Sequence, residues 1–165
     1  MKIPRLHTPA GVRHEQVFDT GAEDAYRATE KLPEPTVCRK CGATYHGGRW
    51  TWRHAPASAH KIVCPACLRI EDDFPGGYLA LKGDFVSEHR EEILAVVNAR
   101  EAQEKAEHPL QRIMAIREQE DGLTVTTTDP HLARGIAQAL GSAFNGTVRL
   151  NYSRGENLLR ATWRR

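Results

Sequence analysis

The feature that most constrains this chain is a matched pair of cysteine motifs. Its four cysteines form Cys38-Arg39-Lys40-Cys41 and Cys64-Pro65-Ala66-Cys67, with twenty-two residues between the motifs. A C-x2-C motif places two thiolates on one tight turn, and two facing turns make a closed four-sulfur site that suits Zn²⁺. We therefore predict one structural zinc ion held by Cys38, Cys41, Cys64 and Cys67, with no open coordination position for a substrate.

Disulfides or inert thiols are the alternative to this metal site. Disulfides require an oxidising compartment, and the basic start of the chain, residues 1–7, is not followed by the apolar segment of a secretory signal. No apolar run approaches the ~20 residues that cross a membrane. We therefore expect a cytoplasmic, reducing location.

The histidines between the motifs are alternative ligands that we interpret as surface residues: His46, His54 and His60.

Charge is unevenly distributed along the chain, although the net charge is only +2. Residues 37–83 carry seven basic and three acidic side chains, and residues 122–165 carry six basic and two acidic ones. Residues 84–121, between them, carry five basic and ten acidic side chains. Two basic regions favour an anionic partner such as a phosphate backbone. The acidic segment can instead be a solvated helix that balances its neighbours.

Aromatic and basic residues alternate between the cysteine motifs. Gly47 and Gly48 predict a turn, and residues 49–53 (Arg-Trp-Thr-Trp-Arg) then alternate with the period of a strand. Single-stranded nucleic acid is bound by such aromatic rings beside guanidinium groups. The tryptophans can instead cover the metal site, and we expect one buried and one partly exposed. The candidate RNA-binding residues are Arg39, Lys40, Arg49, Trp50, Trp52, Arg53, Lys61 and Arg69.

The pattern of prolines and apolar residues predicts three regions. Residues 1–36, with four prolines and little periodicity, predict a mobile N-terminal arm. Residues 37–76 form the zinc ribbon, and residues 77–165 form an α+β domain. The domain is predicted to contain strands over 78–81, 113–116, 123–128, 147–152 and 158–163, and helices over 85–107 and 130–144. The apolar stripe of the second helix predicts four buried residues: Leu132, Ile136, Leu140 and Phe144.

This order predicts an α+β fold class. A zinc ribbon is followed by a ferredoxin-like β-α-β-β-α-β unit with one extra C-terminal strand. Such a unit has helices on one face of its sheet and leaves the other face open. On that face we expect two sets of residues, which suit phosphate and hydroxyl contacts but also suit an ordinary solvated sheet: Thr124, Thr126 and Thr128, and Arg149, Arg160 and Arg164.

Several stretches together resemble a known family: residues 37–42, 48–52 and 64–67, then 126–134 and the closing Trp163-Arg164. On these residues the chain is similar to a short bacterial relative of the nonsense-mediated decay protein three family, the archaeal and eukaryotic adaptor that escorts large ribosomal subunits during export. The resemblance covers about residues 37–165. It implies association with ribosomal RNA or with ribosomes.

Two functions follow as expectations. The first is a noncatalytic zinc-ribbon protein that binds RNA and is associated with the ribosome. The second is a protein-interaction adaptor with a structural zinc and no nucleic acid, in which the acidic helix over 85–107 docks on a basic partner. An enzyme is disfavoured, because the sequence has no phosphate-binding loop and no supported catalytic triad.

Overall fold

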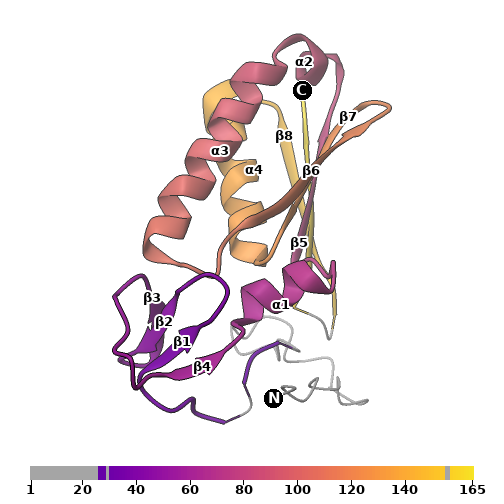
Figure 1. Ribbon diagram of the computed structural model, residues 1–165. Coiled ribbons are helices and arrows are strands. Elements are labelled where there is room, and N and C mark those ends of the chain that lie inside the picture. Colours follow the sequence, from indigo (N-terminus) through magenta and orange to yellow (C-terminus); the bar gives the residue numbers. More distant parts are fainter. Residues whose placement is uncertain (1–25, 29, 155–156) are drawn as a thin grey trace.

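The computed structural model describes residues 26–28, 30–154 and 157–165, and it contains two separate sheets (Figure 1). The first sheet and the helix after it belong to the predicted ribbon. Their elements are β1 (Thr36–Cys38), β2 (Thr44–His46), β3 (Arg49–Thr51), β4 (His60–Ile62) and α1 (Pro65–Glu71). The strand order is β3-β2-β1-β4, and β1 pairs antiparallel with β2 but parallel with β4.

The predicted turn at Gly47 and Gly48 joins β2 to β3. Both glycines have positive φ, 61° and 76°, a conformation that costs glycine nothing sterically. Their N–H groups donate to the carboxylate of Glu34 at 3.0 and 2.9 Å. The hydrogen bonds from Gly48 and Gly47 lower the pKa of Glu34. The segment before β1 is thereby tied to this turn. Most of the predicted N-terminal arm, residues 1–25, lies outside the described residues.

The second sheet and its helices follow the order expected from the sequence, and the α+β class is confirmed. The elements are β5 (Gly77–Lys82), α2 (Asp84–Glu88), α3 (Arg90–Glu107), β6 (Ile113–Gln119), β7 (Gly122–Thr127), α4 (Pro130–Phe144), β8 (Thr147–Tyr152) and β9 (Leu159–Arg164). The helix predicted over 85–107 is divided at His89, whose φ of −121° and ψ of 30° are not helical.

The extra strand, β9, lies inside the sheet. The strand order is β6-β7-β5-β9-β8, so β9 pairs in parallel with β5 and moves β8 to the edge. A ferredoxin-like unit would place its fourth strand, here β8, beside its first. The burial of the two strands explains why β9, and not β8, lies beside β5. Leu159, Ala161 and Trp163 of β9 are buried, whereas every residue of β8 is exposed or half-buried. The more apolar strand takes the central place.

Helix α4 begins as the sequence predicts. The carboxylate of Asp129 caps it by accepting the backbone N–H of His131 at 2.7 Å, and Pro130 occupies the first turn. Helices α3 and α4 lie on the same side of the five-stranded sheet (Figure 1). Because α4 packs against α3 and against four strands of the sheet, it is the centre of the core.

The apolar stripe of α4 enters this core. Leu132, Ile136 and Leu140 are fully buried, as predicted. Phe144 was expected to be buried but is half-buried, because it lies in the last turn, where it packs beside Phe85 with ring centroids 5.6 Å apart. None of the described helices is both long and apolar enough to cross a membrane.

The substitution Ile136→Ala is expected to lower the free energy of unfolding by about 2–4 kcal/mol, because it leaves a cavity in a well-packed core. Urea unfolding followed by circular dichroism measures this change. The matched control is Gln138→Ala, an exposed position on the same helix, which should change the stability by no more than about 0.5 kcal/mol. Equal effects of the two substitutions would contradict the assignment of this face to the core.

Candidate metal centre

The first cysteine motif lies in the turn that follows β1. Cys38 is the last residue of β1, and its N–H donates to the carbonyl of Ala43 at 2.8 Å. The N–H of Gly42 donates back to the carbonyl of Cys38 at 2.9 Å. Gly42 has a φ of +78°, which L side chains rarely adopt, so a glycine after Cys41 is what lets the turn close. The two thiols are thereby held on one side of the turn.

The second motif lies at the start of helix α1, which the sequence analysis did not predict. Cys64 is the N-cap residue, and its Sγ accepts the backbone N–H of Cys67 at 3.5 Å. Pro65 occupies the first turn, where its missing N–H leaves no hydrogen bond unmade. The N–H of Cys64 also donates to the Sγ of Cys38 at 3.3 Å, which joins the two motifs directly.

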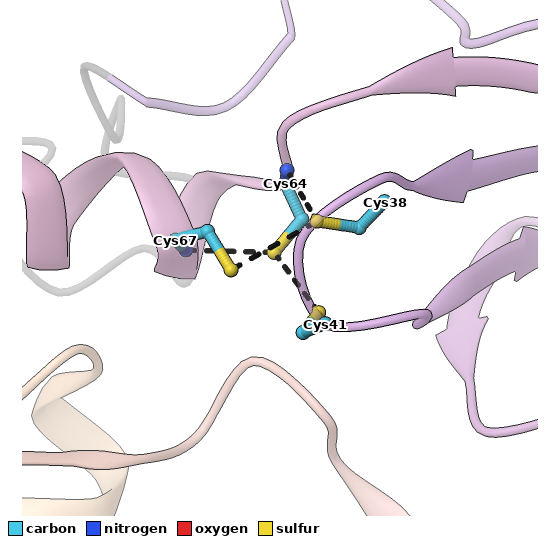
Figure 2. A group of neighbouring side chains, drawn as sticks. All are labelled: Cys38, Cys41, Cys64 and Cys67. Carbon is cyan, nitrogen blue, oxygen red and sulfur yellow. Dashed lines mark hydrogen bonds between the residues drawn. The ribbon is translucent and has the colours of Figure 1, made fainter.

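The four sulfur atoms point toward one another between the turn and the helix (Figure 2). The Sγ atoms of Cys38 and Cys67 are 3.8 Å apart, as are those of Cys41 and Cys64, and all four lie within 4.8 Å of one another. A tetrahedron with Zn–S bonds of about 2.3 Å has edges of about 3.8 Å. The cysteines are free thiols and not disulfides, which would need sulfur atoms about 2 Å apart. The cluster therefore fits one metal ion bound by four thiolates.

Hydrogen bonds within the cluster and burial shift the pKa values of three of its thiols, those of Cys38, Cys64 and Cys67. Hydrogen bonds from the thiols of Cys41 and Cys64 lower the pKa of Cys38, and the hydrogen bond to Cys38 correspondingly raises the pKa of Cys64. Burial raises the pKa of Cys67. Metal binding must displace the thiol protons, so we expect the metal affinity to fall as the pH falls.

A charged side chain, Arg112, lies against the cluster. Its Nη1 donates to the Sγ of Cys67 at 3.5 Å, and its Nη2 donates to Cys64 at 3.3 Å and to Cys41 at 3.5 Å. Its Nε donates to the carbonyl of Pro109 at 2.9 Å, which fixes the plane of the guanidinium. Burial opposes this charge, but the hydrogen bond to Cys67 and the field of the thiolates raise the pKa of Arg112.

Arg112 also joins the metal centre to the α+β domain. It lies just before β6, and its backbone N–H donates to the hydroxyl of Thr128 at 2.9 Å, between β7 and α4. A divalent ion with four thiolates carries a net charge of −2, and one guanidinium reduces it to −1. The role of Arg112 could not be predicted from the sequence, because an arginine before a strand has the pattern of an ordinary surface cation. Its 9 % exposure shows that it is not one.

Apolar side chains shield the cluster from water. Val63 and Ala66 are buried beside the cysteines, and Trp50, Leu68 and Leu110 are partly buried and pack against them. Trp50 also meets Tyr45 edge-on, with ring centroids 5.6 Å apart. Of the two tryptophans, Trp50 is thus the less exposed and belongs to the ribbon's small core, although it is half-buried and not buried as predicted.

Trp52, by contrast, is 40 % exposed and lies just after β3. Its indole N–H donates to the carbonyl of Lys105, near the end of α3, at 2.6 Å. Trp52 lines a hollow of about 480 Å³ together with Arg53, His54 and Lys61. This hollow, the Trp52 hollow, has no carboxylate among its described lining residues.

The remaining predicted RNA-binding residues are distributed around the ribbon. Arg39 and Arg49 are exposed. Lys40 is exposed as well and forms an ion pair with Glu71. Arg69 is only 4 % exposed, and its Nη1 donates to the carbonyl of Phe74 at 3.0 Å, so the side chain belongs to the end of α1 and not to an open surface.

The histidines between the motifs, His46, His54 and His60, are exposed and do not join the sulfur cluster.

A comparison of the chain with known proteins found no matching family model, no similar curated protein and no similar solved structure. The class that the fold and the site define is therefore an α+β protein with a structural four-cysteine metal centre.

Proposed function

We propose that this protein is a noncatalytic RNA-binding protein in which a zinc-stabilised ribbon contacts phosphates and stacks on an unpaired base. The Trp52 hollow carries this proposal. It combines the exposed indole of Trp52 with the cations Arg53 and Lys61 and the imidazole of His54, and it has no carboxylate among its described lining residues. Base stacking beside basic side chains is how proteins bind single strands with little sequence preference.

The orientation of Trp52 supports a stacking role. Because its indole N–H donates to the carbonyl of Lys105, the ring is held in place while the residue remains 40 % exposed. A fixed ring loses little conformational entropy on binding. Arg39 and Arg49 are further exposed cations of the ribbon, and Lys40 becomes available when its ion pair with Glu71 opens.

Zinc is the metal we propose for the centre, because four thiolates and no open position define a structural zinc site. The resemblance of residues 37–42 and 64–67 to the nonsense-mediated decay protein three family is our reason to propose ribosomal RNA, or the ribosome, as the target, although no family model matches the chain. The same ligand set supports a noncatalytic role, since four thiolates would fill a tetrahedral site and leave no position for a substrate.

RNA binding is tested with a labelled single-stranded RNA of mixed sequence. If four to six cations meet phosphates, the affinity should fall by about two orders of magnitude between 50 and 200 mM salt. Replacing Arg49 and Arg53 together by alanine should weaken binding to all sequences alike and make the dependence on salt less steep.

The two tryptophans provide an internal control. Trp52→Ala should weaken RNA binding about tenfold while the metal content and the fold are retained, because it removes one stacking surface. Trp50→Ala should instead destabilise the ribbon, because Trp50 packs against the cysteine cluster. If neither RNA nor ribosomes show salt-sensitive binding, the adaptor function is the better one, with the acidic helix α3 as the docking element.

A further inference from the structure

The five-stranded sheet has an open face that is strongly basic. Strand pairing places alternate residues of all five strands on the side opposite α3 and α4. Five of these residues are cationic and none is acidic: Lys82, Arg117, Arg149, Arg160 and Arg164. Except for Thr126, which is buried, the residues of this face are exposed or half-buried. We call it the open sheet face.

The middle of this face is a flat row of small side chains between two arginines. In register, the row runs Arg117, Thr124, Ala80, Thr162 and Arg149. At a strand spacing of about 4.8 Å, the two arginine backbones lie about 19 Å apart. Small side chains let an extended ligand approach the sheet closely, and the arginines at its ends supply two anchoring points.

The rows on either side add charge and a ring. Lys82 and Arg164 are register partners on one side of the small row. On the other side, the guanidinium of Arg160 lies over the ring of Tyr78, with its Cζ 4.8 Å from the ring centroid. A base can extend this stack on the outer plane of the guanidinium, because bases stack on arginine planes as well as on aromatic rings.

Few carboxylates neutralise these cations. Asp121 lies 3.7 Å from both Lys82 and Arg164, and Asp73 lies 3.8 Å from Arg117. Exposed ion pairs of this kind contribute about 0–1 kcal/mol and are readily exchanged. Arg149 and Arg160 make no ion pair with any described residue. The open sheet face therefore keeps a positive potential that an anionic partner would complement.

We propose that the open sheet face binds the phosphate backbone of an unpaired RNA strand, at a second site distinct from the Trp52 hollow. This inference rests on the proposed function in taking RNA as the ligand. Arginines make up four of the five cations, and their planar forks match phosphate oxygens with two hydrogen bonds at a time. The hydroxyls of Thr124 and Thr162 offer further contacts to phosphate or ribose.

The two surfaces lie on different sides of the domain. Trp52 contacts the end of α3, a helix that covers the other side of the sheet from the open face. Substitutions on the two surfaces should therefore act independently, and their effects on the binding free energy should add.

The test compares three double variants that each remove two charges, with a labelled oligouridine of twelve nucleotides as the probe. The sheet variant is Arg149→Gln with Arg160→Gln, and the ribbon variant is Arg49→Ala with Arg53→Ala. The control is Arg90→Gln with Arg134→Gln, two exposed positions on the helices. Circular dichroism and the metal content should be the same as in the wild type for all three.

We expect the sheet variant to bind about tenfold more weakly at 50 mM salt, and the slope of log affinity against log salt to fall by about 1.4, the value for two phosphate contacts on a single strand. The control should bind within about twofold of the wild type. A variant that combines the sheet and ribbon changes should show the product of the two losses.

Other results would overturn the proposal in distinguishable ways. If the sheet variant behaves like the control while the ribbon variant is weakened, the open sheet face is not an RNA site and the proposed function stands. If the wild type does not bind the probe, both proposals fail. If a labelled oligoglutamate of twelve residues binds as tightly as the RNA and is lost equally in the sheet variant, the face recognises acidic proteins instead.

Discussion

Replacing Cys64 by serine is expected to abolish stoichiometric metal binding and to unfold the ribbon. In a unit this small, the free energy of metal binding is free energy of folding. Serine is itself a good N-cap residue, so the start of α1 keeps its capping group and the loss of the sulfur ligand is isolated. Elemental analysis of the purified protein and the fluorescence of the ribbon tryptophans measure the two effects.

The α+β domain should survive this substitution. Strand β5, which follows the ribbon in the chain, pairs with β7 and β9 and with no ribbon strand. A separate cooperative unfolding transition should therefore remain. The control is Ala57→Ser, an exposed position between the motifs that gains the same hydroxyl group. Wild-type protein without stoichiometric metal, or a Cys64→Ser protein that keeps it, would contradict the assignment of the site.

Replacing Arg112 by methionine should have the second largest effect. It removes the guanidinium that donates to three sulfur atoms and leaves the negative cluster uncompensated. Breaking a buried charge pair in this way costs about 3–5 kcal/mol. We expect a lower unfolding midpoint and earlier loss of metal to a chelator. Arg112→Lys should give an unfolding midpoint and a loss of metal between those of the wild type and Arg112→Met. An ammonium group keeps the charge but lacks the planar fork that donates to several sulfur atoms at once.

A second variant separates the charge of Arg112 from its place in the loop. Thr128→Val removes the hydroxyl that accepts the backbone N–H of Arg112 but leaves the guanidinium intact. It should lower the stability and leave the retention of metal nearly unchanged. If Arg112→Met and Thr128→Val release metal at the same chelator concentration, then the contacts of the guanidinium to sulfur do not stabilise the centre.

The local features of this protein were predictable from its sequence, and the features that depend on distant contacts were not. The cysteine motifs and the cap at Asp129 are defined by residues within a few positions, so spacing alone reveals them. Arg112 donates to Cys67 across 45 positions, and no local pattern records that pairing. Arg69 was proposed as a surface cation of the ribbon, and α1, with only seven residues, gives too short a periodic pattern to reveal that it is buried.

The position of β9 was unpredictable for a related reason. Five strands can be identified by their alternation, but their order depends on which ones compete best for the centre of the sheet. Leu159, Ala161 and Trp163 give β9 one fully apolar face, which is stabilised most by burial at the centre of the sheet. The sequence pattern therefore predicts the number of strands in this sheet, whereas the order of the strands depends on how they pack against α4.

The central place of β9 has a consequence for the order in which the protein folds as it is synthesised. Gly77 of β5 pairs with Leu159 of β9, 82 positions later, so β5 leaves the ribosome long before this partner exists. All four cysteine ligands of the metal centre have been synthesised once the chain reaches Cys67. We therefore expect the ribbon to bind metal and fold first, while β5 keeps an unpaired edge. Nascent chains paused before residue 159 should be the ones that chaperones protect, because exposed strand edges promote aggregation.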